Sequence, residues 1–186
     1  MRTKRNIFGL TAAICLCFAA VLLLFDGINI QQTGLGNGAS AVYSKELAIF
    51  TDTLTETCAT DKEKVDAIYT WITDNIEYDI NDGTILIQTA DPDRIMEEKK
   101  ALCYGYSALF AAMCRSQGIP CNIVDGVSMT DDSAYHSWNA VTIDGRLYSV
   151  DTTSDANAVE TGGELFGFRA IASPEDDEDY IVTRVY

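Results

Sequence analysis

Three residues of this chain have the types and the order of a nucleophilic triad: Cys103, His136 and Asp151. A thiol attacks a carbonyl carbon when an imidazole takes its proton and a carboxylate holds the imidazole in the working tautomer. His136 is the only histidine among the 186 residues. A lone histidine is more often structural than catalytic, so the interpretation depends on whether the fold brings the three side chains together.

The segment from His136 to Asp151 predicts a β-hairpin. Asp144-Gly145 stands between two alternating apolar runs, which is a strong signal for a two-residue hairpin loop. A loop at this point pairs Ile143 with Arg146 and sets the register of both strands. A slip of one residue would move every side chain to the opposite face.

In this register the histidine and the carboxylate lie on the same face. Trp138 falls opposite Asp151 and His136 opposite Thr153, so His136 and Asp151 are diagonal neighbours about 7–8 Å apart at their backbones. Side chains alternate along a strand, so one face carries His136, Trp138, Leu147 and Asp151, and the other carries Val141, Ile143, Tyr148 and Val150.

Cys103 begins a predicted helix. Apolar residues recur at positions 106, 109, 110, 113 and 114, and Gly118 with Pro120 signals the end. The unpaired N–H groups and the dipole at a helix N-terminus favour a thiolate, and a backbone N–H there can hold a developing oxyanion. The alternative is that Cys103 is a small buried apolar residue, as most free cysteines are.

Two further cysteines fit a structural interpretation. Cys114 lies on the apolar stripe of the predicted helix, and Cys121 opens a predicted buried strand. A disulfide between them is an open alternative. No C-x-x-C pair occurs, so we expect no structural zinc site and no other metal.

Five segments of this chain resemble the transglutaminase-like superfamily. They are Ile68–Asp79, Leu102–Leu109, Gly118–Cys121, His136–Val141 and Tyr148–Thr153, and the similarity spans about residues 60 to 155. The resemblance implies a papain-like α+β fold, with N-terminal helices packed on an antiparallel sheet, and a triad of Cys103, His136 and Asp151. Members usually have glycine two residues before the nucleophile, where this chain has Ala101.

We expect four more residues to contact the substrate or the oxyanion. Tyr78 lies near the end of the upstream helix, and Tyr104 directly follows the nucleophile. Gly105 would keep the site open to substrate. Trp138, together with the adjacent Asn139, would shield the site or shape its pocket.

The resemblance indicates the chemistry better than the substrate, since the superfamily contains cross-linking enzymes, peptidases and amidases. We favour an enzyme without a cofactor that hydrolyses peptide or amide bonds of an extracellular or cell-wall substrate. Two alternatives stay open. One is a cross-linking transglutaminase with an amine acceptor, and the other is a catalytically silent peptide-binding domain.

The N-terminus predicts export. Three basic residues precede an uncharged apolar run from Ile7 to Phe25, which is close to the length needed to span a bilayer. We therefore interpret residues 1–25 as a signal anchor or signal peptide, 26–41 as a flexible stalk and 42–186 as the catalytic domain. A retained anchor makes a single-pass membrane protein with an extracellular domain, whereas cleavage after Ala41 would make a secreted one.

The charge argues against some partners. The chain has a net charge of −15, and the residues from Val42 onward carry −17, because three basic residues and one acid precede them. Such a domain does not suit binding to nucleic acid. A cationic peptide or amine would be tolerated, although the charge also serves solubility. The acidic run Pro174–Asp179 is interpreted as a solvated loop rather than a calcium site.

The remaining elements follow from local signals. A helical stripe runs from Val42 to Cys58, and a capping box at Thr60–Glu63 opens the next helix. Asp91-Pro92-Asp93 begins a short helix to about Lys100. A last strand is predicted from Tyr180 to Val185.

Overall fold

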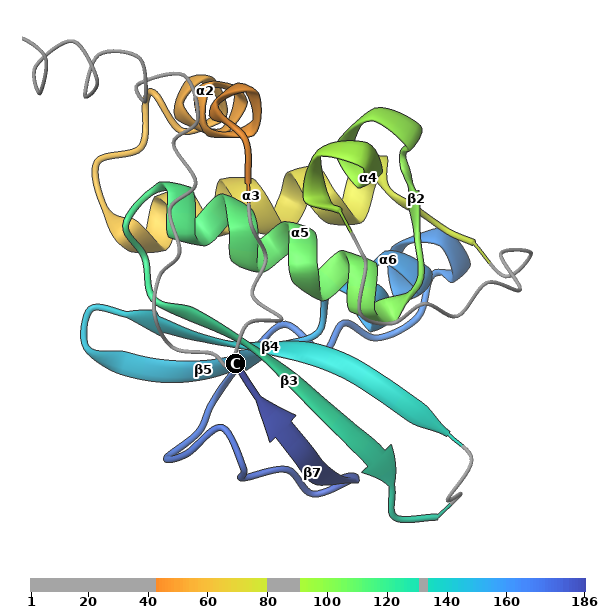
Figure 1. Cartoon of the computed structure of the whole chain (residues 1–186). Coiled ribbons are helices and arrows are strands. Elements are labelled where there is room, and N and C mark those ends of the chain that lie inside the picture. The colour runs from red at the N-terminus through yellow and green to blue at the C-terminus, as the bar shows by residue number, and fades with distance from the viewer. Residues whose placement is uncertain (1–42, 80–90, 131–133) are drawn as a thin grey trace, which may run out of the picture.

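The chain folds as a layer of helices on one face of an antiparallel sheet (Figure 1). The computed structural model describes residues 43–79, 91–130 and 134–186. The predicted anchor and stalk lie outside these residues. Within the described ranges, no helix is both long enough and apolar enough to cross a membrane.

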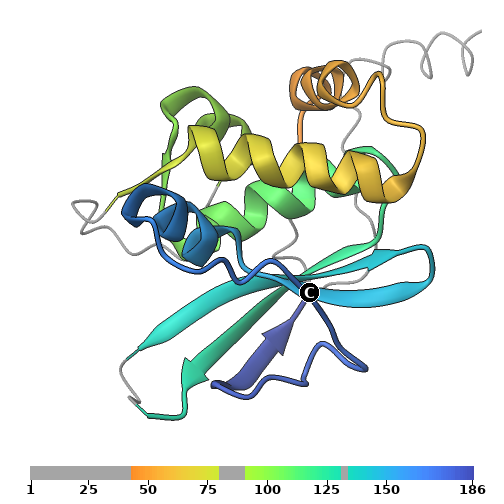
Figure 2. The ribbon, with the colours of Figure 1, turned by 180° about the vertical axis from the view of Figure 1, so that it is seen from behind.

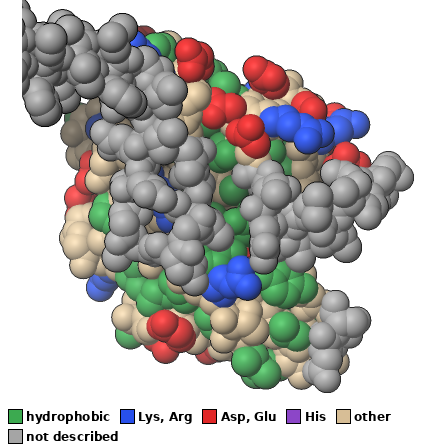
Figure 3. All heavy atoms as spheres, in the orientation of Figure 1, with side chains coloured by type: hydrophobic (Ala, Val, Ile, Leu, Met, Phe, Trp, Pro, Cys, Tyr) green, Lys and Arg blue, Asp and Glu red, His purple; other side chains and the backbone are tan. Residues whose placement is uncertain are grey.

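Three helices of the outer layer begin where local capping signals stand. α2 (Lys45–Leu54) is capped by Ser44, and α3 (Asp61–Asn75) has the predicted capping box between Thr60 and Glu63. α4 (Pro92–Glu98) begins with proline at its first turn and ends at Lys99 in the left-handed region. These starts confirm the expected elements, although α2 is shorter than the predicted stripe. In Figure 3, side chains of both charges lie over α4, where Arg94 pairs with Glu98.

α5 (Cys103–Ser116) is the central helix of the domain. Every residue from Tyr104 to Arg115 is buried, because α2, α3 and α4 cover one side of the helix and strands β3 and β4 cover the other. The views in Figure 1 and Figure 2 both place α5 between the outer helices and the sheet. A helix buried on all sides has little freedom to shift, so the position of Cys103 at its first turn is well defined.

The main sheet has five antiparallel strands in the order β6-β5-β4-β3-β7. Their bounds are β3 (Cys121–Ser128), β4 (Tyr135–Ile143), β5 (Arg146–Val150), β6 (Phe168–Ala170) and β7 (Tyr180–Val185). The expected last strand is therefore confirmed. A separate parallel pair, β1 (Glu77–Tyr78) with β2 (Lys100–Ala101), joins the end of α3 to the start of α5.

The predicted hairpin register is confirmed. Ile143 pairs with Arg146, and the ladder continues to Asn139 opposite Val150. The expected division of faces also holds. Trp138 and Leu147 belong to an apolar cluster on the outer face, whereas Val141, Ile143, Tyr148 and Val150 pack in the main core beneath α5.

One part of the hairpin prediction is wrong. The ladder ends at Val150, so Trp138 does not pair with Asp151 and His136 does not pair with Thr153. The chain leaves the sheet at Asp151, which caps a new helix, α6 (Thr152–Thr161). Neither α6 nor β6 was expected from the sequence.

The buried cysteines are not bridged. Cys114 and Cys121 are both free thiols, and they lie in hydrogen-bonding contact in the main core. Burial raises the pKa of Cys114, and the neighbouring Cys121 raises it further. These two thiols are therefore structural residues, consistent with the apolar stripe.

Gly105 has a packing role rather than the expected role of leaving room for substrate. A Cβ at this position would lie 2.8 Å from the Cβ of Ala101 and 3.1 Å from Cδ1 of Ile95. The glycine lets α5 approach β2 and α4 closely, and the segment that leads into Cys103 depends on this approach.

We predict that Gly105→Ala lowers the free energy of unfolding by about 1–3 kcal/mol, because overpacking outweighs the better helix propensity of alanine. The double variant A101G/G105A removes the closest clash and should recover most of this loss. Urea denaturation followed by circular dichroism measures both. Equal stabilities of the single and double variants would contradict this account.

Candidate active site

Cys103 is the first residue of α5, as its helical stripe indicated. The N-cap residue, Leu102, makes no side-chain hydrogen bond to the helix. The first-turn N–H groups of α5 are therefore not capped by that side chain. Partial positive charge at this helix end stabilises a nearby anion, whether a thiolate or the oxygen of a reacting carbonyl.

His136 and Asp151 form a direct ion pair. The Nε2 atom of His136 lies 2.7 Å from Oδ2 of Asp151, and the two side chains are 15% and 8% exposed. Cys103 also hydrogen-bonds the imidazole. Because Nε2 faces the carboxylate, Nδ1 is the nitrogen left for the thiol proton. The structure thus brings together all three residues expected from the sequence.

The imidazole reaches the other two groups at an open edge of β4. β5 stops opposite Asn139, so residues 135–138 of β4 have no strand partner on that side. α6 begins in this gap, and Asp151 stands at its start. The shortness of β5 therefore lets a histidine on the outer face meet a carboxylate at the rim and a sulfur on the helical side.

Asp151 is held by two sets of donors. Its Oδ1 accepts hydrogen bonds from the backbone N–H groups of Thr153 and Ser154, which is the geometry of a helix N-cap. Its Oδ2 accepts from the Ser154 hydroxyl at 2.6 Å and faces the imidazole. The carboxylate that orients His136 is therefore also the cap of α6. Sequence reasoning missed Ser154, although an aspartate followed by two threonines and a serine is a helix-start pattern.

A second buried carboxylate fixes α6 itself. Asp155 has no exposed surface, and it accepts a hydrogen bond from the Tyr69 hydroxyl of α3 at 2.8 Å. It also accepts from the backbone N–H groups of Phe166 and Gly167. This residue ties α6 to α3 and to the segment before β6, so the cap at Asp151 cannot shift independently of the core.

The pKa of His136 is raised and the pKa of Asp151 is lowered. Burial alone lowers the pKa of His136, but hydrogen bonds and charge from Asp151 and Cys103 outweigh it and raise the value to about 10. Burial raises the pKa of Asp151, but the imidazolium and Ser154 outweigh it and leave the pKa below its usual value. Both groups are therefore charged across neutral pH.

Tyr78 lies beside the segment that leads into Cys103. β1 pairs Tyr78 with Ala101, two residues before Cys103, and the ring stacks on Tyr106 at 6.5 Å. The side chain keeps much of its surface, since the residue is 44% exposed. Burial raises the pKa of the phenol, and the negative charge of Cys103 raises it further, so Tyr78 is a neutral donor close to the sulfur.

Of the two remaining expected substrate residues, Tyr104 lies away from the site and Trp138 lies beside it. Tyr104 is buried, with its ring against Tyr186, so its side chain belongs to the core and not to a substrate surface. Trp138 is buried on the outer face, where it stacks on His136 at 6.0 Å and shields one side of the imidazole. Asn139 faces the helices and donates to the backbone oxygen of Ser107 at 3.0 Å, which ties β4 to α5.

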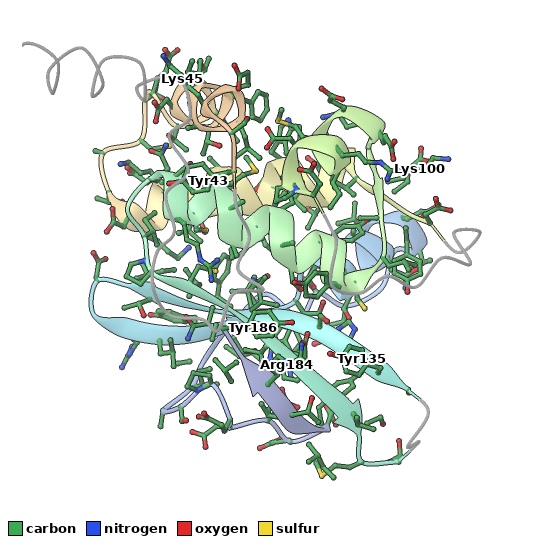
Figure 4. All side chains as sticks on the ribbon, in the orientation of Figure 1. Tyr43, Lys45, Lys100, Tyr135, Arg184 and Tyr186 are labelled. Carbon is green, nitrogen blue, oxygen red and sulfur yellow. The ribbon has the colours of Figure 1, made fainter. Side chains whose placement is uncertain are left out.

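A polar cluster beside the site was not expected. Asp125 of β3 is fully buried and accepts hydrogen bonds from Ser137, Tyr135 and Tyr186. Figure 4 shows Tyr135, Arg184 and Tyr186 gathered over the sheet below α5. Burial and the Asp125 hydrogen bond raise the pKa of Tyr135, and the charge of Cys103 adds to this.

A cysteine at the start of a central helix, beside a histidine on an antiparallel sheet, defines a papain-like fold. Residues 49–152, more than half of the chain, match the Transglutaminase-like superfamily. The chain therefore belongs to this superfamily.

Two curated relatives match part of this chain and a smaller part of their own length. The chain is 39% identical over 119 residues to human kyphoscoliosis peptidase (Homo sapiens), a match that covers 59% of this chain and 18% of that protein. The mouse protein of the same name (Mus musculus) is 37% identical over 118 residues, with 58% and 18% covered. The matched region is thus less than a fifth of the length of either relative.

Two solved structures share the fold. A candidate cysteine protease from Cytophaga hutchinsonii superposes with a TM-score of 0.51 at 23% identity, covering 68% of this chain and 41% of that one. LapG of Legionella pneumophila superposes with a TM-score of 0.51 at 11% identity, covering 76% and 72%. At such identities the likeness establishes the fold alone.

We predict that Ser154→Ala slows alkylation of Cys103 by iodoacetamide about tenfold at neutral pH, because Asp151 loses a charge-assisted hydrogen bond and the imidazole loses its orientation. Thr153→Val is a matched control, since the Thr153 hydroxyl makes no hydrogen bond within the described residues. Labelling rates by mass spectrometry measure the effect. Equal slowing in both variants would contradict a specific role for Ser154.

We also predict a pH-dependent contribution of His136 to stability. The raised pKa means that the stabilisation is fully present below the unfolded value of 6.5 and is lost as the pH rises toward about 10. The difference in free energy of unfolding between the wild type and His136→Gln should therefore shrink between pH 6.5 and 10. Urea titrations across this range measure it, and a constant difference would contradict the ion pair.

Proposed function

We propose that the domain is a cysteine hydrolase that cleaves peptide or amide bonds through an acyl-enzyme. Cys103 is the nucleophile, His136 the general base and Asp151 the residue that orients the base. The observation that carries the proposal is the contact of one imidazole with both the carboxylate and the sulfur. The name of the human relative, a peptidase, supports hydrolysis for a chain 39% identical over 119 residues.

The proposed reaction uses the side chains and backbone N–H groups described at the site. The imidazole of His136, whose pKa is raised to about 10, holds the thiol proton on Nδ1, and the sulfur attacks the carbonyl carbon of the substrate. The carbonyl oxygen then carries negative charge, which the first-turn N–H groups of α5 and the phenol of Tyr78 can stabilise. The imidazolium returns its proton to the leaving amine, and water activated by the same imidazole releases the acid and the thiol.

We infer that this reaction takes place outside the cytoplasm. The basic N-terminus and the apolar run from Ile7 to Phe25 support export and a retained membrane anchor. The substrate would then be an extracellular or cell-wall peptide. The charge of −17 from Val42 onward makes an anionic polymer a poor partner.

We expect Cys103 to be alkylated at neutral pH at least tenfold faster than Cys58, which is partly exposed but has no paired histidine. His136→Gln should abolish the difference. Peptide mapping after timed iodoacetamide exposure provides the rates. If Cys103 and Cys58 react at the same rate, the site lacks an activated nucleophile and a binding domain becomes the better interpretation.

Hydrolysis and cross-linking differ in what they do with a primary amine. We predict that a peptide library is cleaved by the wild type, and that Cys103→Ala and Asp151→Asn lose on the order of a thousandfold or more in rate. A glutamine peptide with a labelled amine serves as the second assay. Incorporation of the amine without cleavage would replace the hydrolase proposal by a transglutaminase.

A further inference from the structure

A pocket of about 530 Å³ opens beside the ion pair, on the face of the sheet away from the helices. Its floor includes His136, Trp138 and Ser149, and its wall is the segment between β6 and β7. Figure 2 shows this segment passing along the sheet on the side opposite the helices. The pocket adjoins the site described above, and His136 and Asp151 belong to both, whereas its other lining residues have no role in the proposed acyl transfer.

Ser149 is a buried hydroxyl without a protein partner. The residue is 3% exposed, it lines the pocket, and its Oγ makes no hydrogen bond within the described residues. A buried hydroxyl that is left unpaired costs free energy, and because this oxygen has almost no accessible surface, a donor in the pocket would reach it after the Ser149 side chain turns toward the pocket. The position of Ser149 therefore points to a ligand with a hydrogen-bond donor.

The wall of the pocket carries an excess of negative charge. Four successive acidic residues, Asp176 to Asp179, line it together with Asp151, whereas Arg169 and the imidazolium of His136 are the cations among the lining residues. The guanidinium of Arg169 is stacked on the ring of Phe166 at 3.8 Å. Glu178 and Asp179 are exposed, and their carboxylates make no hydrogen bond in the described part of the chain. Such a wall attracts a cation and repels an anion.

The remaining surface suits an aliphatic stem that ends in a charge. The rings of Trp138 and Tyr180 lie 5.2 Å apart at one side of the pocket. Aromatic faces bind methylene stems and attract cations. His136 lines the pocket and also contacts Cys103, so the pocket and the sulfur are separated by one side chain. Burial raises the pKa of Tyr180, and the charges of Asp151 and Cys103 raise it further.

We propose that this pocket is a specificity subsite for a lysine or arginine side chain of the peptide whose carbonyl Cys103 attacks. The side chain would lie along Trp138 and Tyr180, donate to the Ser149 Oγ and face Glu178 and Asp179. The inference rests on the proposed function for the link to catalysis, whereas binding of the cationic side chain does not require a reaction.

The binding test uses the Cys103→Ala protein, in which no acyl-enzyme forms. Acetyl-Lys-Lys-amide and acetyl-Nle-Nle-amide differ in charge but share the aliphatic stem. Titration is followed by the fluorescence of Trp138 in a Trp71→Phe background, since the chain has two tryptophans, and by calorimetry without that change in case the background variant unfolds. We expect saturable binding of the lysine peptide only, weakened by salt.

Matched variants locate the binding. Glu178→Gln with Asp179→Asn should weaken the lysine peptide at least tenfold, and Ser149→Ala about tenfold, through loss of a hydrogen bond to a charged group. Glu46→Gln with Glu97→Gln removes the same charge from exposed positions of α2 and α4 and should change binding less than twofold. Equal weakening by the two double variants, or equal binding of the two peptides, overturns the subsite.

A kinetic assay distinguishes the proposed hydrolase function from the proposed subsite. In the wild type, peptides with lysine or arginine near the cleaved bond should have at least tenfold higher kcat/KM than norleucine counterparts, and the Glu178/Asp179 variant should remove this preference. Lysine-peptide binding without any turnover supports the subsite and counts against the hydrolase. Turnover without preference, together with no binding, supports the hydrolase and overturns the subsite.

Discussion

The site depends on the carboxylate of Asp151, which has two structural tasks at once. One oxygen caps α6 through two backbone N–H groups, and the other faces the imidazole and accepts from Ser154. A capping aspartate has little rotational freedom, because turning it would expose the helix end. The orientation of His136 is therefore set by the start of a helix, which is itself fixed to the core by Asp155. A buried charge in such a position is stable only with several donors, and here four groups supply them.

A second constraint is the unequal length of two neighbouring strands. β5 ends at Val150 while β4 extends four residues further toward its own start, so the rim of the sheet is open where His136 stands. A longer β5 would have paired with this segment and kept the imidazole on the outer face, away from α5. Because the chain turns into α6 directly after Val150, the first residues of β4 have no partner strand on that side. The residue at this turn, Asp151, is the one that supplies the carboxylate. Cys103, His136 and Asp151 thus come from three elements that meet at one corner of the domain.

Much of this arrangement could be predicted because its signals are local. The Asp144-Gly145 loop sets the register of the hairpin, and the apolar stripe after Cys103 predicts the central helix. The start of α6 was missed because two β-branched threonines after Asp151 suit a continuing strand as well as a helix. The role of Gly105 could not be seen, since it depends on how closely another segment approaches. The pocket was also beyond local reasoning, because its wall, the segment between β6 and β7, is distant in the sequence from its floor.

The two faces of the sheet have separate tasks, and His136 connects them. On the helical face, the buried α5 holds the sulfur in a rigid setting, as covalent chemistry requires. On the outer face, a short strand and an acidic segment form a more open surface, where Ser149 is left without a protein partner. Rigid packing suits the reacting atoms, whereas a surface segment can change without disturbing them. A domain built in this way can keep the proposed acyl-transfer centre unchanged while the outer segment varies, which is what the proposed subsite for a cationic side chain requires.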